Sequence, residues 1–200
     1  MGIEVVYRRL PESEFESILA DPEKGRAFMT PSLPGFDLKA LSALGRDPEA
    51  LFAKKAEILA AFAKQREDPK RVDLQKDWQA LHFLLTGDSS REIAHRSDEP
   101  LHNVVMGGHP TSLKAGYDFV RRFSIEDVRA IARELAKISV EDLRKRFSAD
   151  AFNQAKIYPN PRPQGWDERG VEYVFHIFPK LVRFFEEAAN AGEIVVVYAE

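Results

Sequence analysis

The order of apolar and polar positions predicts a series of helices framed by two terminal strands. Residues 2–10 alternate between apolar and polar side chains and are rich in Ile, Val and Tyr, which is typical of a half-buried strand. Residues 193–198 are nearly all Val and Ile, which indicates a strand buried on both faces. We therefore expect a small sheet in which the C-terminal strand is central and lies beside the opening strand.

Apolar residues recur at helical spacing in most of the chain between these strands. Ser, Thr, Asp and Asn cap helices because their side chains accept hydrogen bonds from the first free amides. The pattern predicts helices that start at six such residues, namely Ser13, Asp47, Asp73, Ser124, Ser139 and Ser148. A long last helix is expected over 171–191, with a kink or restart at Pro179 and its end at Gly192.

The remaining segments carry turn residues and predict less regular structure. Residues 24–47 are expected to be a loop with at most a brief helix, and residues 88–100 a polar connection with at most one helical turn. Residues 101–106 and, more weakly, 117–123 are expected to be strands. The proline-rich segment 158–166 predicts a surface loop. The expected fold is α+β, mostly helical, with a small sheet that includes both terminal strands.

Composition limits the class of protein. The chain has 200 residues, of which 44% are hydrophobic and 30% charged, so one globular domain over 1–200 is expected. It contains no cysteine, which excludes disulfides, thiolate ligands and thiol catalysis and fits a reducing compartment. The first residues form neither a basic leader nor a long apolar segment, so we expect a cytoplasmic protein.

Charge and hydropathy argue against several partners. The net charge of −3 is spread without a block of like charges, and this gives no electrostatic surface for phosphate backbones. No apolar stretch is long enough to span a bilayer. We expect no nucleic-acid or membrane partner, no cofactor, and a monomer or weak dimer. A protein partner stays possible.

The histidines are the first candidates for chemistry because only imidazole titrates near neutral pH without perturbation. His95, His102 and His109 are seven residues apart, but Pro100 and the glycines at 107 and 108 break the helix that would align them, so no metal site is expected. His82 follows Trp78 by four residues on the apolar face of a predicted helix. It is either a hydrogen-bonded core residue or, as the best catalytic candidate, a general base.

Three further features have two interpretations each. Asp73 and Asp77, one helical turn apart, are either a coupled carboxylate pair or two acids that favour a helix N-terminus. The amides after Gly107 and Gly108 either receive an anion or simply turn the chain. Tyr158 and Trp166 either pin their loop to the body or line a recognition surface.

Several of these segments together resemble the YfbM-like family, a bacterial family of domains of unknown function. The most specific is the run Asp-Leu-Gln-Lys-Asp-Trp-Gln-Ala-Leu-His-Phe-Leu-Leu-Thr-Gly at 73–87, and the others are the Met-Gly-Ile opening, residues 104–108, Tyr158-Pro159 with Trp166, and the Val-rich terminal strand. The resemblance covers essentially the whole chain. It implies an α+β fold and a cytosolic bacterial protein, and it implies no activity and no catalytic residues.

Two functional hypotheses follow, and whether the protein is an enzyme stays open between them. In the first, a non-enzymatic binding or accessory domain recognises another protein through a surface where six residues converge: Trp78, His82, Gly107, Gly108, Tyr158 and Trp166. In the second, a small-molecule enzyme of hydrolase type uses His82 as general base, with an acid partner and the glycine amides as an anion site.

Overall fold

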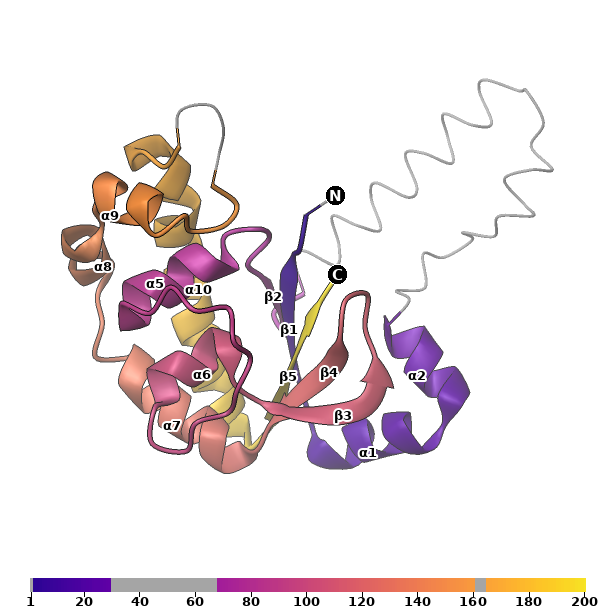
Figure 1. Ribbon diagram of the computed structural model, residues 1–200. Helices are drawn as coiled ribbons and strands as arrows, with labels where there is room; N and C mark the ends of the chain where they lie inside the picture. The colour runs from indigo at the N-terminus through magenta and orange to yellow at the C-terminus, as the bar shows by residue number, and fades with distance from the viewer. Residues whose placement is uncertain (1, 30–67, 161–164) are drawn as a thin grey trace, which may run out of the picture.

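A computed structural model describes residues 2–29, 68–160 and 165–200 (Figure 1). In these residues five strands form one antiparallel sheet in the order β2-β1-β5-β4-β3. The strands are β1 (Val5–Leu10), β2 (Arg71–Asp73), β3 (His109–Lys114), β4 (Phe119–Phe123) and β5 (Ile194–Ala199). Both terminal strands belong to the sheet and β5 lies at its centre beside β1, as the sequence predicted.

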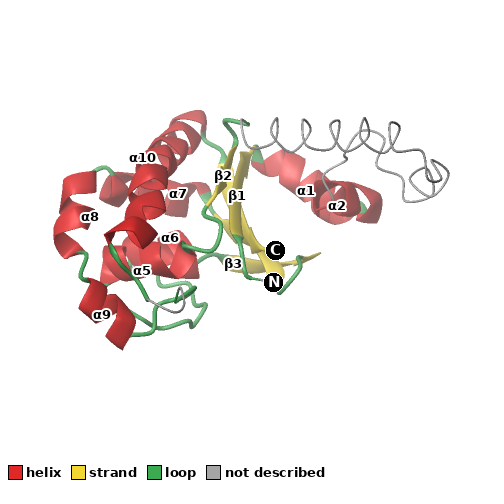
Figure 2. Ribbon diagram, turned by 90° about the horizontal axis from the view of Figure 1, so that it is seen from above, coloured by secondary structure: helices red, strands yellow, loops and turns green. Residues whose placement is uncertain are grey.

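Helices cover both faces of the sheet (Figure 2). On one face lie α1 (Glu12–Ala20) and α2 (Pro22–Met29). The other face carries the larger helical layer: α5 (Trp78–Thr86), α6 (Pro100–Met106), α7 (Ile125–Leu135), α8 (Val140–Arg146), α9 (Ala149–Gln154) and α10 (Glu168–Ala191). The α+β, mostly helical fold is confirmed. No helix in the described ranges has the length and apolarity needed to cross a membrane.

Side chains of β5 point alternately to the two faces of the sheet, so this strand contributes to two separate cores. Val195 and Val197 face the large helical layer, where they join the core that contains α5, α7 and α10. Val196 and Tyr198 point the opposite way, into a smaller core with Phe15 of α1. A side chain on either face is therefore removed from water, which explains why the strand has no polar alternation.

The cap chemistry of the C-terminal half is confirmed. Ser124 and Ser139 each accept a hydrogen bond from the third amide of α7 and α8, and the third residue's carboxylate accepts one from the cap amide. Gly192 ends α10 in the left-handed conformation, with φ of 63°. A kink or a restart was expected at Pro179, and the restart does not occur, because α10 is one continuous helix through this exposed proline.

The prediction of a strand over 101–106 is wrong. These residues belong to α6, which has Pro100 in its first turn and packs between α5 and α7. Tertiary packing of Val104 and Val105, both buried, overrides the β preference of valine. The glycines at 107 and 108 do not stop a strand but precede one, β3, which the sequence did not predict; β4 is the weaker strand expected over 117–123.

Three helix starts also differ from prediction. The helix expected from Asp73 begins at Trp78, because Asp73 ends β2 and its carboxylate accepts a hydrogen bond from the Gln75 amide at 2.7 Å. The helix α1 starts after Pro11 without a side-chain cap, so the capping box at Ser13 is not formed. Residues 24–29 were expected to belong to a loop, but they lie in the helix α2. The helix expected after Asp47 lies outside the described residues.

The buried Arg121 joins the sheet to the helical layer. Its guanidinium on β4 donates hydrogen bonds to the carbonyls of Gly107 and, at 3.1 Å, Val105 at the C-terminal end of α6. Only 7% of Arg121 is exposed, and burial lowers its pKa. The partly negative carbonyl end of α6 is thus stabilised by a cation held in the sheet.

We expect the Arg121→Met variant to be less stable than wild type by about 2–4 kcal/mol, because two buried carbonyls lose a charged donor. The matched control is Arg122→Met. Arg122 forms its ion pairs with Glu12 and Glu16 at the surface, so its loss costs less than about 1 kcal/mol. Urea denaturation measures both. Equal losses in the two variants would contradict the role assigned to Arg121.

Candidate functional site

Two of the predicted site residues, Trp78 and Tyr158, hold the N-terminal segment in place. The Trp78 Nε1 donates to the Ile3 carbonyl at 3.1 Å, and the Tyr158 hydroxyl accepts a hydrogen bond from the Ile3 amide at 2.8 Å. Their rings lie 5.5 Å apart. Trp78 is buried and Tyr158 is partly buried. The two aromatic residues therefore meet, and the described contacts assign both of them to anchoring the chain.

Trp166 pins its loop to the body of the protein. It is 2% exposed, and its Nε1 donates to the Ile157 carbonyl at 2.7 Å. The Asn153 side chain accepts from the Trp166 amide at 2.7 Å and donates to the Trp166 carbonyl at 3.1 Å. The ring packs edge-on to Phe152. A tryptophan with this burial and a satisfied indole N–H is part of the core.

The turn at Gly107 and Gly108 is buried and its polar groups are in use. The Gly107 carbonyl accepts from Arg121, and the Gly108 amide donates to Nδ1 of His95 at 3.3 Å. Gly108 has φ of 88°, and a side chain at Gly107 would clash with Asn103. These contacts favour the role of a tight turn between α6 and β3 over that of an anion site.

His82 lies in the interior of the protein, on the same helix as Trp78. It is 0% exposed, and its ring packs edge-on to that of His102 at 5.1 Å. Its ring nitrogen, one of His102 and a carboxylate oxygen of Asp88 lie within 4.8 Å of one another. Burial, with the nearby His102 as the second cause, lowers the pKa of His82 to about 4, so the ring is neutral at physiological pH.

The three histidines spaced by seven residues separate into two places. His102 contacts His82, whereas His95 stacks on His109 at 4.2 Å and places its Nε2 3.4 Å from the Asp127 carboxylate. The three imidazoles are not aligned on one helix, as the sequence indicated, but the stacking of His95 on His109 was not predicted. The contact between His82 and His102 was not predicted, because it depends on the packing of α5 against α6.

Asp73 and Asp77 lie in different elements, Asp73 at the end of β2 and Asp77 at the N-terminus of α5. Burial raises the pKa of Asp77 from 3.8 to about 6. Desolvation is the cause, and no neighbouring carboxylate contributes. The Asp77 side chain makes no capping hydrogen bond. It is therefore a half-buried acid that weakens the native state when it ionises.

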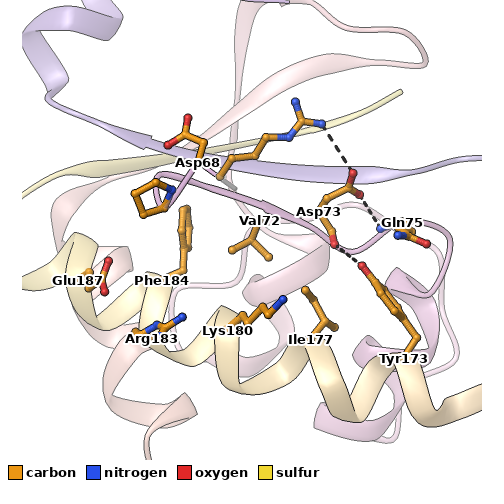
Figure 3. A pocket seen from close by; sticks show the side chains of 12 residues that line it. Asp68, Val72, Asp73, Gln75, Tyr173, Ile177, Lys180, Arg183, Phe184 and Glu187 are labelled. Atoms are coloured by element: carbon orange, nitrogen blue, oxygen red, sulfur yellow. Dashed lines mark hydrogen bonds and ion pairs between the residues drawn. The ribbon is translucent and has the colours of Figure 1, made fainter. Parts of the chain in front are cut away.

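A groove between the edge strand β2 and one flank of α10 combines apolar and charged side chains (Figure 3). It has a volume of about 470 Å³. Its walls come from β2 and its flanks, with Asp68, Pro69, Arg71, Val72, Asp73 and Gln75, and from α10, with Tyr173, Ile177, Lys180, Arg183, Phe184 and Glu187. Figure 3 shows the two sets of side chains on opposite sides of the hollow.

The groove has an apolar floor and a charged rim. Val72, Ile177 and Phe184 are at most 7% exposed. On the rim, Arg71 lies 3.2 Å from Glu200, and Glu187 lies 2.7 Å from Arg9 outside the groove. Apolar floors with polar rims are typical of recognition sites.

Two cations of the groove, Lys180 and Arg183, have charges that no ion pair compensates in the described part of the chain. Both residues are exposed. Both lie on the α10 side of the hollow (Figure 3). Free cations beside an apolar surface favour a partner with negative charge.

Sequence reasoning missed this groove, although one signal was present. Ile177 and Phe184 are apolar and seven residues apart, but they lie beside the main apolar stripe of the last helix rather than on it. A widened stripe indicates that the helix contacts a second surface. Strand β2, only three residues long, was not predicted, so its side of the groove could not be foreseen.

Comparison with known proteins gives one family. Residues 1–198 match the family model described as "Domain of unknown function (DUF1877)". Protein YfbM of Escherichia coli (strain K12) is 36% identical over 91 residues, which is 45% of this chain and 52% of YfbM, about half its length. The crystal structure of YfbM, a protein of unknown function from E. coli, matches with a TM-score of 0.58 over 98% of this chain and 99% of that chain. At 17% identity this match shows the fold alone.

We expect Asp77→Asn to stabilise the protein at pH 7 by about 2 kcal/mol. Below pH 4 the acid is protonated in both the folded and the unfolded state. Between pH 4 and 6 the folded protein keeps a proton that the unfolded chain has released, so the wild type loses stability as pH rises through this window. The Asn variant cannot ionise there.

Urea denaturation at pH 4, 5, 6 and 7 measures this difference in the free energy of unfolding. The exposed Asp98 provides the control, since Asp98→Asn is expected to change little across the same range. A difference between Asp77→Asn and wild type that does not grow from pH 4 to 7 would contradict the cause assigned to the shifted pKa.

Proposed function

We propose that this chain, which belongs to the DUF1877 family of domains of unknown function, is a binding domain that recognises another protein. The occupant of the β2–α10 groove is an extended, acidic segment of that partner, with an apolar side chain at its centre. The observation that carries this proposal is a pair of exposed cations beside an apolar floor, Lys180 and Arg183, which form no ion pair with any residue that the structure describes. The domain is accessory rather than catalytic.

The place of the groove in the fold supports an extended ligand. Strand β2 is an edge of the sheet, and a segment that lies along an edge strand can place alternate side chains into a neighbouring pocket. Two backbone groups here have intramolecular partners: the Arg71 amide donates to the Asp68 carbonyl, and the Tyr173 hydroxyl donates to the Asp73 carbonyl at 3.0 Å. The side chains of the ligand therefore carry more of the affinity than backbone pairing.

The distribution of perturbed titratable groups favours binding over catalysis in the groove. Active sites are where burial and neighbouring charges shift pKa values most strongly. The residues of the described chain whose pKa values are strongly shifted are Tyr7, Asp77 and His82. None of these three residues lines the groove.

The alternative function, a small-molecule hydrolase with His82 as general base, needs a substrate that reaches His82. Asp88 lies close enough to be an acid partner. However, His82 is 0% exposed, and the Gly108 amide already donates a hydrogen bond to His95. This alternative therefore requires the segment after α5 to open, and the groove proposal does not.

A peptide-display selection on the immobilised full chain tests the groove. We expect enrichment of peptides in which an apolar residue is flanked by Asp or Glu. The double variant Lys180→Glu/Arg183→Glu should weaken their binding by about 10-fold or more, because both rim charges reverse. NMR shifts on adding such a peptide should be confined to residues 68–75 and 173–187.

The control is a double charge reversal on α7. Arg129→Glu/Arg133→Glu changes the net charge by the same amount on a different hollow, so it should leave the affinity within about 2-fold of wild type. Three outcomes contradict the proposal: no enriched acidic peptide, equal losses in the two double variants, or NMR shifts outside the groove. Far-UV circular dichroism confirms that each variant is folded.

A further inference from the structure

Three potential metal ligands meet in the interior, away from the groove. The metal-binding atoms of His82, Asp88 and His102 lie within 4.8 Å of one another. A zinc ion with ligands at about 2.0–2.2 Å holds neighbouring ligand atoms about 3.5 Å apart. A contraction of about 1 Å therefore converts this cluster into a coordination site.

The two imidazoles lack the hydrogen bonds that buried rings normally make. His82 is 0% and His102 2% exposed, and neither ring has a nitrogen with a hydrogen-bond partner of normal geometry. The Ala94 carbonyl is near enough to raise the pKa of His102, against the larger lowering effect of burial. Buried polar atoms are nearly always paired, so these unpaired ring nitrogens require an explanation, and a bound ion would account for one nitrogen of each ring.

The cluster offers the lone pairs and the charge that a cation needs. One ring nitrogen of a neutral imidazole has a free lone pair that can bind a metal ion. Asp88 supplies the negative charge. Arg96 is the cation nearby: its guanidinium lies 2.9 Å from Glu99 and 3.9 Å from Asp88, so its charge is largely compensated.

The scaffold holds the three ligands from well-defined elements. His82 lies on α5 and His102 on α6, two helices that pack together. Asp88 follows α5 directly, and its amide donates to the Thr86 hydroxyl at 3.0 Å. The Asn103 side chain, next to His102, both accepts from and donates to the backbone of Arg96, which fixes the segment that covers the cluster.

A second cluster of similar composition is less suited to an ion. His95, His109 and Asp127 also lie within 4.8 Å of one another. However, His95 accepts from the Gly108 amide through Nδ1 and faces Asp127 through Nε2, and the Asp127 carboxylate accepts from the Ser124 amide and hydroxyl. These groups already have partners, whereas the rings of His82 and His102 do not.

We propose that His82, Asp88 and His102 are the protein ligands of a divalent transition-metal ion, for which Zn²⁺ is the best fit. Two imidazole nitrogens and one carboxylate oxygen are ligands that Zn²⁺ accepts, and a water molecule completes four-fold coordination. The Asp88 side chain is 34% exposed and provides the route by which the ion enters. The site joins α5 to α6 independently of any ligand in the groove.

Calorimetric titration of chelator-treated, tag-free protein with Zn²⁺ alone tests the site. We expect one ion per chain and a thermal midpoint that rises with Zn²⁺ concentration. Asp88→Asn should weaken the affinity by more than about 100-fold, because loss of even an outer partner costs about 10–100-fold. This substitution keeps the oxygen that accepts from the Ser90 amide, so the segment stays in place.

His109→Ala is the matched control, since it removes an exposed ligand of the second cluster and should leave the affinity unchanged. The ¹⁵N shifts of the histidine ring nitrogens in wild type identify the ligands without any substitution, and those of His82 and His102 should move on adding Zn²⁺. The proposal is overturned by three results: no stoichiometric binding, unchanged affinity in Asp88→Asn, or ring shifts confined to His95 and His109. The absence of stoichiometric Zn²⁺ binding would mean that the rings of His82 and His102 bind water only.

Discussion

The burial of β5 on both faces is the constraint on which the rest of the structure depends. Val195 and Val197 need a helical layer on one face, and the residues that alternate with them, Ile194, Val196 and Tyr198, need a cover on the other face. A buried side chain of this size contributes about 1.5–3 kcal/mol each. The helices α5 to α10 and the α1–α2 pair satisfy the two requirements (Figure 2). Recognition is therefore left to the margins of the sheet, where the short strand β2 borders the groove.

Several buried polar side chains complete the hydrogen bonding of a neighbouring backbone segment. Tyr7 donates to the Val104 carbonyl at 2.7 Å, Arg121 donates to carbonyls at the end of α6, and the Asn103 side chain accepts from the Arg96 amide and donates to the Arg96 carbonyl. Glu193 instead pairs with Arg9 and Lys70. Among the described residues, the buried rings of His82 and His102 have no hydrogen-bond partner, and the Nε atoms of Arg9 and Arg71 are also unpaired. The two imidazoles lie beside the Asp88 carboxylate in one cluster, and this arrangement favours a bound ion there.

The sequence predicted what depends on local chemistry. The capping boxes at Ser124 and Ser139, the glycine end of α10 and the two-faced final strand follow from side chains within a few residues of one another. What it missed depends on partners far away in the chain. Residues 101–106 form a helix because α5 and α7 flank them, and β2 exists only because β1 pairs with it. Both sites also depend on residues that are distant in the chain. The groove joins residues about one hundred positions apart, and the contact of His82 with His102 requires α5 to pack against α6.

Backbone hydrogen exchange, measured against denaturant concentration, tests most directly whether β5 organises the fold. If β5 organises the fold, the amides of residues 195–197 exchange only through global unfolding, with an opening free energy equal to that of the whole protein. The amides of β2 should open at lower cost, as suits the wall of a binding groove. Exchange of the β5 amides through local opening, while α10 stayed protected, would contradict the central role of this strand in holding the two layers.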